Sequence, residues 1–315
     1  MPRSESQTSS NKPKIIFLVG PTAVGKSEVS IYLARKIKGE IISCDSMQIY
    51  KGMDIITSKP YASVLKRTPH HLISVIPADK EYNVSRYRKD ALKKVINILK
   101  RGRVPVLVGG TGLYMSILID GIFEQSVQDD TFRKKMYALS AKNGSPYLHS
   151  RLKEIDPDSA KRIHPNDAKR IIRALEVYEA TGKPISVLQK ERRGLKDDFD
   201  VRVFCLNMQR DKLYKRIDER VDRMFRQGLV DEVKRLSRKR LSKTASCAIG
   251  IKELSGYLEG AYDLEEARRL MQRNSRRYAK RQLTWFKKDK RIKWINIKDK
   301  DRPQEIAARI WKILS

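Results

Sequence analysis

The segment Gly20–Ser27, with the sequence GPTAVGKS, restricts the folds open to this chain more than any other feature. A glycine, four other residues and then Gly-Lys-Ser is the pattern of loops that wrap around phosphate groups. The apolar run Ile15–Val19 before it is expected to be a buried strand, and Glu28–Lys36 after it has the composition of a helix. This order predicts an α/β fold in which the loop joins a strand to a helix N-terminus.

The residue types in this loop are those that polyphosphate binding requires. Glycine lets the backbone turn its N–H groups toward a ligand, and the helix N-terminus adds positive potential. Lys26 is expected to neutralise phosphate oxygens, and the Ser27 hydroxyl is expected to ligate Mg²⁺. The predicted phosphate-binding residues are Gly20, Thr22, Ala23, Val24, Gly25, Lys26 and Ser27. The motif indicates a polyphosphate ligand without specifying a nucleoside triphosphate.

Further apolar runs predict the rest of a sheet. They are Glu40–Cys44, Leu72–Ile76, Val104–Val108, Val201–Asn207 and Ile292–Ile297. Segments with helical periodicity separate them, and the clearest places Tyr87, Ala91 and Val95 on one face. Strands rich in Val, Ile and Leu that alternate with amphipathic helices predict an α/β fold, a P-loop NTPase-like parallel sheet flanked by helices.

The composition changes between residues 121 and 200. Strand-like runs disappear there, and charged residues and helix formers dominate. Prolines divide the segment, at Pro146, Pro157, Pro165 and Pro184. We therefore predict a small helical domain inserted into the α/β core. The expected organisation is a disordered tail at 1–13, the first part of the core at 14–120, the insert at 121–200, and the rest of the core with basic C-terminal helices at 201–315.

The chain carries a large excess of positive charge. Lys and Arg number 68 against 37 Asp and Glu among 315 residues, which gives a formal net charge of +31. Solubility alone needs a net charge of only about 2–8 in a small domain. The excess therefore favours a polyanionic partner, and nucleic acid before an acidic membrane surface.

The sequence also predicts the setting in which the protein works. No run approaches the about 18 apolar residues of a membrane span, and the polar N-terminus lacks the apolar segment of a secretion signal. Cys44, Cys205 and Cys247 are far apart and lack metal-ligand spacing. We therefore expect no membrane association, no disulfides and a cytoplasmic location. We also expect a monomer.

Two other loops are expected near Gly20–Ser27, because ligands of parallel sheets bind beyond the carboxyl ends of the strands. Asp45 follows Glu40–Cys44, and Thr111 follows Val104–Val108. Beside positive groups Asp45 should stay ionised, which makes it a candidate base; a structural or Mg²⁺-holding acid is the alternative. Thr111 either contacts the ligand or caps the following helix.

Basic residues concentrate toward the C-terminus. Arg273, Arg277 and Arg281 recur on one helix face, which is suited to phosphate contacts. Tyr278 and Trp285 form a different stripe together with Met271, and for this aromatic stripe core packing is favoured over stacking on bases. A second basic run at 234–243 is either an RNA contact or a solvated helix face.

Taken in order, these segments resemble the tRNA dimethylallyltransferase family, also called tRNA isopentenyltransferases. The resemblance is carried by GPTAVGKS (20–27), DSMQIYKGMDIITSKP (45–60), HHLISV (70–75), VPVLVGGTGLY (104–114), HPNDAKRIIRALEVYEATGKPIS (164–186), RIDERVDRMFRQGLVDEV (216–233), AIGIKEL (248–254) and NSRRYAKRQLTWFKKD (274–289). The family implies transfer of a dimethylallyl group from dimethylallyl diphosphate to N6 of the adenosine at position 37 of tRNA, next to the anticodon, with release of diphosphate.

The resemblance also assigns roles to individual residues. It implies that Gly20–Ser27 grips the diphosphate with Mg²⁺ and that Arg220 reaches the same group, although Arg216 and Arg223 share its helix. It makes Asp45 the general base and Thr111 a second catalytic-site group. The implied contacts with the tRNA anticodon stem-loop are Asp45, Ser46, Met47, Gln48, Lys169, Arg170, Ile171, Ile172, Arg173, Cys247, Ala248, Ile249, Gly250, Ile251, Lys252, Lys280, Arg281, Gln282, Leu283, Thr284, Trp285, Phe286 and Lys287.

Two features depart from the wider family. Ile251 stands where the family usually has an aromatic residue, so stacking on a base is not expected there. The chain ends at Ser315 without the zinc-finger tail of many eukaryotic members, and we expect the domain content of bacterial members.

Three alternative functions explain some of these sequence features but not all of them. A P-loop kinase acting on a nucleotide explains the phosphate loop and Asp45, but neither the basic helices nor GGTGLY at 109–114. An ATP-driven RNA-remodelling protein needs an apolar strand that ends in an acid, whereas Val104–Val108 is followed by Gly-Gly. A prenyltransferase acting on free adenine nucleotides needs neither a helical insert nor a row of arginines.

Overall fold

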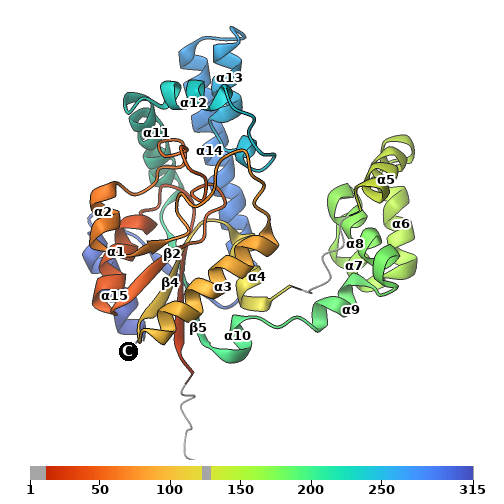
Figure 1. Cartoon of the computed structure of the whole chain (residues 1–315), viewed down its shortest axis with the longest axis horizontal. Coiled ribbons are helices and arrows are strands. Elements are labelled where there is room, and N and C mark those ends of the chain that lie inside the picture. The colour runs from red at the N-terminus through yellow and green to blue at the C-terminus, as the bar shows by residue number, and fades with distance from the viewer. Residues whose placement is uncertain (1–11, 123–128, 315) are drawn as a thin grey trace, which may run out of the picture. The chain divides into compact units, whose positions relative to one another are not determined.

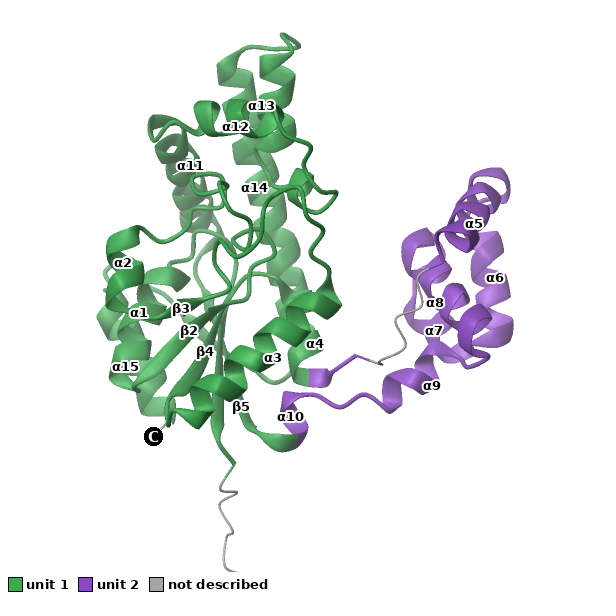
Figure 2. Cartoon of the chain, viewed as in Figure 1, with its two compact units in different colours: residues 1–119, 198–315 green, residues 120–197 purple. Residues whose placement is uncertain are grey.

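The structure is a computed structural model that describes residues 12–122 and 129–314. The chain forms two compact units (Figure 2). The core unit comprises the chain up to Ile119 together with the chain from Asp198 onward, and the helical unit comprises Asp120–Asp197. Of the tail predicted at 1–13, residues 1–11 lie outside the described part of the chain, and the Pro13 carbonyl accepts a hydrogen bond from the Asp200 N–H at 3.1 Å.

A six-stranded sheet forms the centre of the core unit (Figure 1). Its strands are β1 (Lys14–Val19), β2 (Gly39–Ser43), β3 (His70–His71), β4 (Val104–Gly109), β5 (Asp200–Asn207) and β6 (Ile292–Asn296). They lie in the order β3-β2-β4-β1-β5-β6, and every neighbouring pair is parallel. The predicted α/β class with a parallel sheet is confirmed.

The core unit also contains helices. They are α1 (Lys26–Lys36), α2 (Ala62–Arg67), α3 (Val84–Lys100), α4 (Gly112–Asp120), α11 (Arg210–Arg226), α12 (Leu229–Ser237), the short 3₁₀ helix η1 (Ala245–Cys247), α13 (Ile251–Leu258), α14 (Leu264–Phe286) and α15 (Pro303–Leu314). Helices α1 and α15 lie on one side of the sheet and α3 on the other (Figure 1). Helices α11 and α13 pack against the long helix α14.

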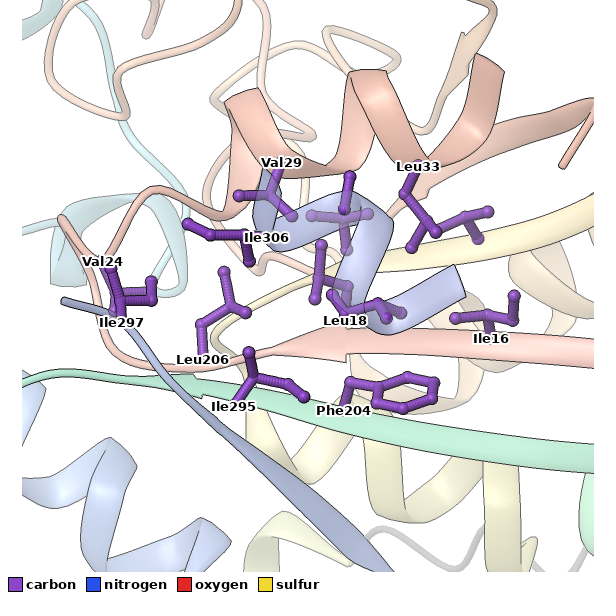
Figure 3. Packing of buried hydrophobic residues seen from close by; sticks show 14 of the residues in the cluster. Ile16, Leu18, Val24, Val29, Leu33, Phe204, Leu206, Ile295, Ile297 and Ile306 are labelled. Atoms are coloured by element: carbon purple, nitrogen blue, oxygen red, sulfur yellow. The ribbon is translucent and has the colours of Figure 1, made fainter. Parts of the chain in front are cut away.

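One continuous apolar cluster joins the sheet to α1 and α15 (Figure 3). Its members include Ile16, Leu18, Val29, Leu33, Phe204, Leu206, Ile295 and Ile306. The strand residues in it are alternate ones, because successive side chains of a strand point to opposite faces. Burial of each such side chain contributes about 1.5–3 kcal/mol relative to exposure. The cluster therefore fixes β1 and α1, the two elements that hold the ends of the phosphate loop.

The strand predicted at Leu72–Ile76 is wrong. Only His70–His71 pairs with β2, and a single bridge joins Ile76 to Tyr50. Leu72 and Ser74 have φ angles of 61° and 52°, in the left-handed region that a strand cannot use. The N–H groups of Ser74 and Val75 instead donate to the carbonyls of Gln48 and Ile49, at 2.9 and 2.7 Å, so this apolar run supports the loop after β2.

The helical unit has its own apolar core. Its helices are α5 (Asp130–Asn143), α6 (Ser145–Ile155), α7 (Pro157–Arg162), α8 (Ala168–Thr181), α9 (Ile185–Lys190) and α10 (Leu195–Asp198). Helices α5, α7 and α8 begin at aspartate caps, at Asp129, Asp156 and Asp167. The unit ends before the predicted boundary at residue 200, because Asp200 pairs with Lys14 as the first residue of β5.

The structure bears on two expectations from the sequence, those about membrane spans and about the cysteines. Within 12–122 and 129–314, no helix combines the length and the apolar character needed to cross a bilayer. Cys44, Cys205 and Cys247 are all free thiols, the first two buried and the third exposed.

Candidate active site

The phosphate loop lies between β1 and α1, where the sequence places it. Gly20 has a φ of 145°, and a Cβ atom there would lie 2.7 Å from the carbonyl oxygen of Leu206 in β5, so only glycine fits. Gly25 has a φ of 98° and caps α1, and Ala23 is also left-handed with a φ of 64°. These conformations coil the loop at the N-terminus of α1, where the helix dipole favours an anion.

Neighbouring groups balance the positive charge of Lys26 only in part. Its Nζ donates a hydrogen bond to the Pro21 carbonyl oxygen of the same loop at 2.7 Å. Burial is the main cause that lowers the pKa of Lys26 to about 8; repulsion from Arg220 adds to it, and the Asp45 carboxylate partly opposes it. A phosphate beside Lys26 would stabilise its charged form, so the loop is suited to an anionic ligand.

Arg220 reaches the phosphate loop from α11. Its Nη1 donates to the Thr22 hydroxyl at 2.8 Å, and its Nε donates to the Ser58 hydroxyl at 2.9 Å. Burial and the neighbouring Arg223 lower the pKa of Arg220, and Asp45 opposes this. Of the three arginines of α11 considered for this role, Arg220 is therefore joined to the loop by its side chain, whereas Arg216 approaches the loop at Gly25.

Two adjoining pockets of the core unit open beside the loop. The narrow pocket, of about 80 Å³, is lined by polar groups that include Lys26, Ser27 and Gln48. The wide pocket, of about 310 Å³, has mainly apolar walls, among them Ile56, Ile217, Val221, Met224, Ala248 and Met271. Both are lined by Thr22, Asp45, Thr57, Arg220 and Tyr278. A polar anion site thus joins an apolar chamber, and Asp45 lies where they meet.

The strand-end loop that carries Asp45 is held from two directions. Asp45 Oδ1 accepts hydrogen bonds from the N–H groups of Met47 and Gln48, at 2.8 and 3.4 Å. Thr111 Oγ1 accepts from the Ser46 N–H at 3.1 Å and donates to the Ser46 hydroxyl at 3.5 Å. The Thr111 hydroxyl is thus directed at the loop of Asp45, whereas the sequence analysis expected it to contact the ligand or to cap the following helix.

Gln282 joins the phosphate loop to the loop after β4. Its Oε1 accepts a hydrogen bond from the Thr22 N–H at 2.9 Å, and its Nε2 donates to the Gly110 carbonyl oxygen at 2.8 Å. The side chain is buried and lines the narrow pocket. A Cβ atom on Gly110 would lie 2.0 Å from Gln282 Nε2, which explains why the second glycine of Gly109-Gly110 is needed. Gln282 therefore holds these loops together and does not lie on the surface, where a direct tRNA contact requires it.

Glu232 is a site residue that the sequence analysis missed. This buried carboxylate of α12 accepts hydrogen bonds from the N–H groups of Asp54, Ile55 and Ile56, at 3.0, 2.9 and 2.9 Å. It thereby fixes the loop that presents Thr57 to both pockets and Ser58 to Arg220. Its only signal in the sequence is an acid on the apolar face of a helix, between Leu229 and Val233.

The predicted RNA-contacting segment 280–287 of α14 has two faces. Lys280, Arg281, Thr284, Trp285 and Lys287 are exposed, Gln282 and Phe286 are buried, and Leu283 is partly buried. Core packing is confirmed for Met271 of the aromatic stripe, which is buried. It is wrong for Trp285, which is 37% exposed and packs against Gly112.

Tyr278, the third residue of the aromatic stripe, lines both pockets. Burial and the Asp45 carboxylate raise the pKa of Tyr278 to about 12, which keeps its hydroxyl neutral at the pocket wall.

The other predicted tRNA contacts also divide by burial. In 247–252, Cys247 and Lys252 are exposed, Ile249 and Ile251 are half-buried, and Ala248 and Gly250 are buried. In the helical unit, Lys169 and Arg170 are exposed, and Arg173 pairs with the buried Glu176 at 2.6 Å. Ile171 and Ile172 belong to the core of that unit, so the prediction of side-chain contacts with RNA does not hold for them.

Known proteins with the same sequence pattern identify the family. A family model described as IPP transferase matches residues 48–289. The chain belongs to the IPP transferase family. The tRNA dimethylallyltransferase of Geobacter sulfurreducens is 46% identical over 287 residues, which cover 90% of this chain and 92% of that relative. The tRNA dimethylallyltransferase of Thermotoga maritima is 48% identical over 303 residues, covering 96% of this chain and 98% of that relative. The family resemblance read from the motifs is confirmed.

Solved structures of similar proteins agree with this assignment. The tRNA isopentenylpyrophosphate transferase of Bacillus halodurans is 40% identical, with a TM-score of 0.72 and coverage of 96% of each chain. A eukaryotic dimethylallyltransferase acting on tRNA is 31% identical, with a TM-score of 0.77, and the match covers 95% of this chain and 77% of that one. The phosphate loop, the pockets and α14 therefore lie in a fold that this family of transferases shares.

Proposed function

We propose that this IPP transferase family member transfers the dimethylallyl group of dimethylallyl diphosphate to N6 of the adenosine at position 37 of tRNA, next to the anticodon, and releases diphosphate. The observation that carries the proposal is the junction of the narrow, positively charged pocket with the wide, apolar pocket. A diphosphate suits the first, and a prenyl group with a purine base suits the second. Asp45, on the wall shared by both, lies where the two substrates would react.

Both the adenine amine and the departing diphosphate need assistance from the protein in this reaction. The exocyclic amine of adenine is a weak nucleophile, because its lone pair is delocalised into the ring. As its C–N bond to the allylic carbon forms, the C–O bond to diphosphate breaks, and the electron pair leaves with the diphosphate. Lys26, Arg220 and the loop N–H groups stabilise that charge. Asp45 takes the amine proton, and the apolar walls keep water from the allylic cation.

A magnesium ion fits the narrow pocket as a partner of the diphosphate. Mg²⁺ binds oxygen atoms and is commonly held by one or two side chains together with substrate phosphates. The Ser27 hydroxyl and the Asp45 carboxylate both line this pocket, and in the described residues no group of three or more Asp, Glu, His or Cys forms a separate metal site. We propose that Ser27 holds the ion, which when bound neutralises charge on the diphosphate.

The acceptor is proposed to be the anticodon stem-loop of tRNA. The relatives compared above are named for action on tRNA, which supports this acceptor over a free adenine nucleotide. The exposed Arg281 of α14 lines the wide pocket, and a base that is stacked in RNA cannot enter that pocket without flipping out. We place the reaction in the cytoplasm, where tRNA is available. Because one unit of one chain lines both pockets, we propose a monomeric enzyme.

A direct assay tests the proposal. Labelled dimethylallyl diphosphate is incubated with unmodified tRNA in one reaction and with AMP in another, each with and without ATP. We expect label in tRNA and no requirement for ATP. Label in AMP with none in tRNA would establish the free-nucleotide enzyme, and ATP turnover in step with product would establish the kinase.

Replacing Arg281 with alanine is expected to weaken tRNA binding. Arg281 is exposed on α14 and lines the wide pocket, and the loss of one phosphate contact should lower the slope of log affinity against log salt by about one. Filter binding over a salt series measures this. Arg269→Ala removes an equal charge from the same helix, where Glu266 pairs with it, and it should have a smaller effect. Equal effects of the two variants would contradict a specific contact by Arg281.

A further inference from the structure

The charges of the narrow pocket do not by themselves explain selection of a diphosphate. Loops with this motif also bind nucleoside triphosphates. Lys26 and Arg220 line the pocket, and Arg223 is close enough to lower the pKa of Arg220. Positive groups attract a triphosphate more strongly than a diphosphate, since the attraction grows with the charge of the anion. Exclusion of the longer anion therefore requires a geometric cause.

Such a cause is present at Thr22, in the phosphate loop. The backbone N–H groups of such a loop are the donors that bind phosphate oxygens. The Thr22 N–H donates instead to Gln282 Oε1, at 2.9 Å, and the Thr22 hydroxyl accepts from Arg220 at 2.8 Å. The Thr22 N–H is thus already paired within the protein, and a third phosphate finds one backbone donor fewer.

The carboxamide of Gln282 cannot easily move out of the way. Its Nε2 donates to the Gly110 carbonyl oxygen at 2.8 Å, and the side chain is only 6% exposed. The position of a Cβ on Gly110 lies 2.0 Å from that Nε2 atom, so the loop backbone is packed directly against the amide. A phosphate that displaced Gln282 would leave a buried amide without partners, which is costly.

We infer that Gln282 makes the narrow pocket selective for a diphosphate over a triphosphate, by occupying the Thr22 N–H and by forming the buried pocket wall beside it. The inference rests on the proposed function, in which the pocket holds the diphosphate of the donor. Gln282 is a specificity-determining residue in this scheme: it takes no part in proton transfer, and it lies among residues of α14 proposed to contact tRNA.

Inorganic diphosphate and inorganic triphosphate are the probes that isolate this effect, because neither carries a prenyl group or a base. Isothermal titration calorimetry at one fixed free Mg²⁺ concentration gives the two dissociation constants for the full-length protein. Wild type should prefer diphosphate. In Gln282→Ala the preference should shift toward triphosphate by about tenfold, since one hydrogen bond to a charged group becomes available. Gly110→Ala should shift it in the same direction, because its Cβ displaces the Gln282 carboxamide.

Gln272→Ala is the matched control. Gln272 lies on the same helix and donates from its Nε2 to Asp222 at 3.1 Å, so it should leave the preference unchanged. If Gln282→Ala and Gly110→Ala bind diphosphate with the wild-type preference, the inference about Gln282 is wrong and the proposed function stands. If wild type itself prefers triphosphate, or fails to bind diphosphate, both the inference and the proposed donor are overturned.

Discussion

Replacing Asp45 with asparagine is expected to lower kcat for prenyl transfer by a factor on the order of 10²–10⁴, the usual contribution of a general base. The substitution keeps the shape of the side chain and an acceptor for the Met47 N–H, which Asp45 Oδ1 binds at 2.8 Å. The loop should therefore keep its conformation, and tRNA affinity should change little. Steady-state kinetics with a saturating donor, together with tRNA binding, separate these two quantities.

The alternative role of Asp45 as a Mg²⁺ ligand makes a different prediction. Loss of a ligand should weaken diphosphate binding, and a higher Mg²⁺ concentration should partly restore it. If Asp45 is the base, a higher Mg²⁺ concentration should not restore kcat in Asp45→Asn. The surface variant Asp79→Asn, on an exposed acid that pairs with Lys80 across 3.5 Å, should behave as wild type. A near-normal kcat in Asp45→Asn would contradict the base role.

The fold could be predicted from the sequence where the local pattern of apolar residues agrees with the tertiary packing. The runs at β1 and β4 are almost entirely apolar and buried, as are Val203–Leu206 of β5, because both faces of the sheet are covered there, and the phosphate loop marks the first crossover. Leu72–Ile76 is equally apolar but became a loop. Its left-handed residues and its hydrogen bonds to 48–49 depend on a segment that precedes it in the chain, and periodicity alone cannot show this.

Site residues could be predicted from the sequence where they belong to a recognisable motif or follow a predicted strand. Lys26 and Ser27 follow from the glycine pattern, and Asp45 follows from its place at a strand end. Glu232 and the bridging role of Gln282 were not predicted, because they depend on contacts across 178 and 172 residues of chain. Such contacts leave no spacing signal in a single sequence.

The predicted tRNA contacts show a second limit. They were assigned as continuous segments, but a helix turns every 3.6 residues, so any such segment includes residues that face inward. Phe286 and Gln282 face inward on α14, and Ile171 and Ile172 do so on α8. The exposed members of the same segments, such as Lys280 and Lys169, remain candidates for phosphate contact.

Replacing Lys26 with alanine is expected to abolish measurable prenyl transfer. Lys26 lies at the start of α1 and lines the narrow pocket, so its ammonium group is placed to balance the charge that develops on the departing diphosphate. Calorimetry with inorganic diphosphate should show greatly weakened binding by Lys26→Ala, and circular dichroism should show an unchanged fold. Full activity in Lys26→Ala would exclude the phosphate loop as the donor site.

The lowered pKa of Lys26 adds a pH test. Because burial and Arg220 lower this pKa to about 8, the free protein loses the ammonium charge as the pH rises through that value. Diphosphate affinity should therefore be full below about pH 8 and should fall above it, whereas bound diphosphate raises the pKa and extends the range over which the complex persists. In Lys26→Arg the charge persists throughout, so the alkaline fall in affinity should disappear, even if kcat is lower because of the larger group. If wild type and Lys26→Arg lose diphosphate affinity together between pH 8 and 9, a group other than Lys26 controls binding, and the proposed role of its charge is wrong.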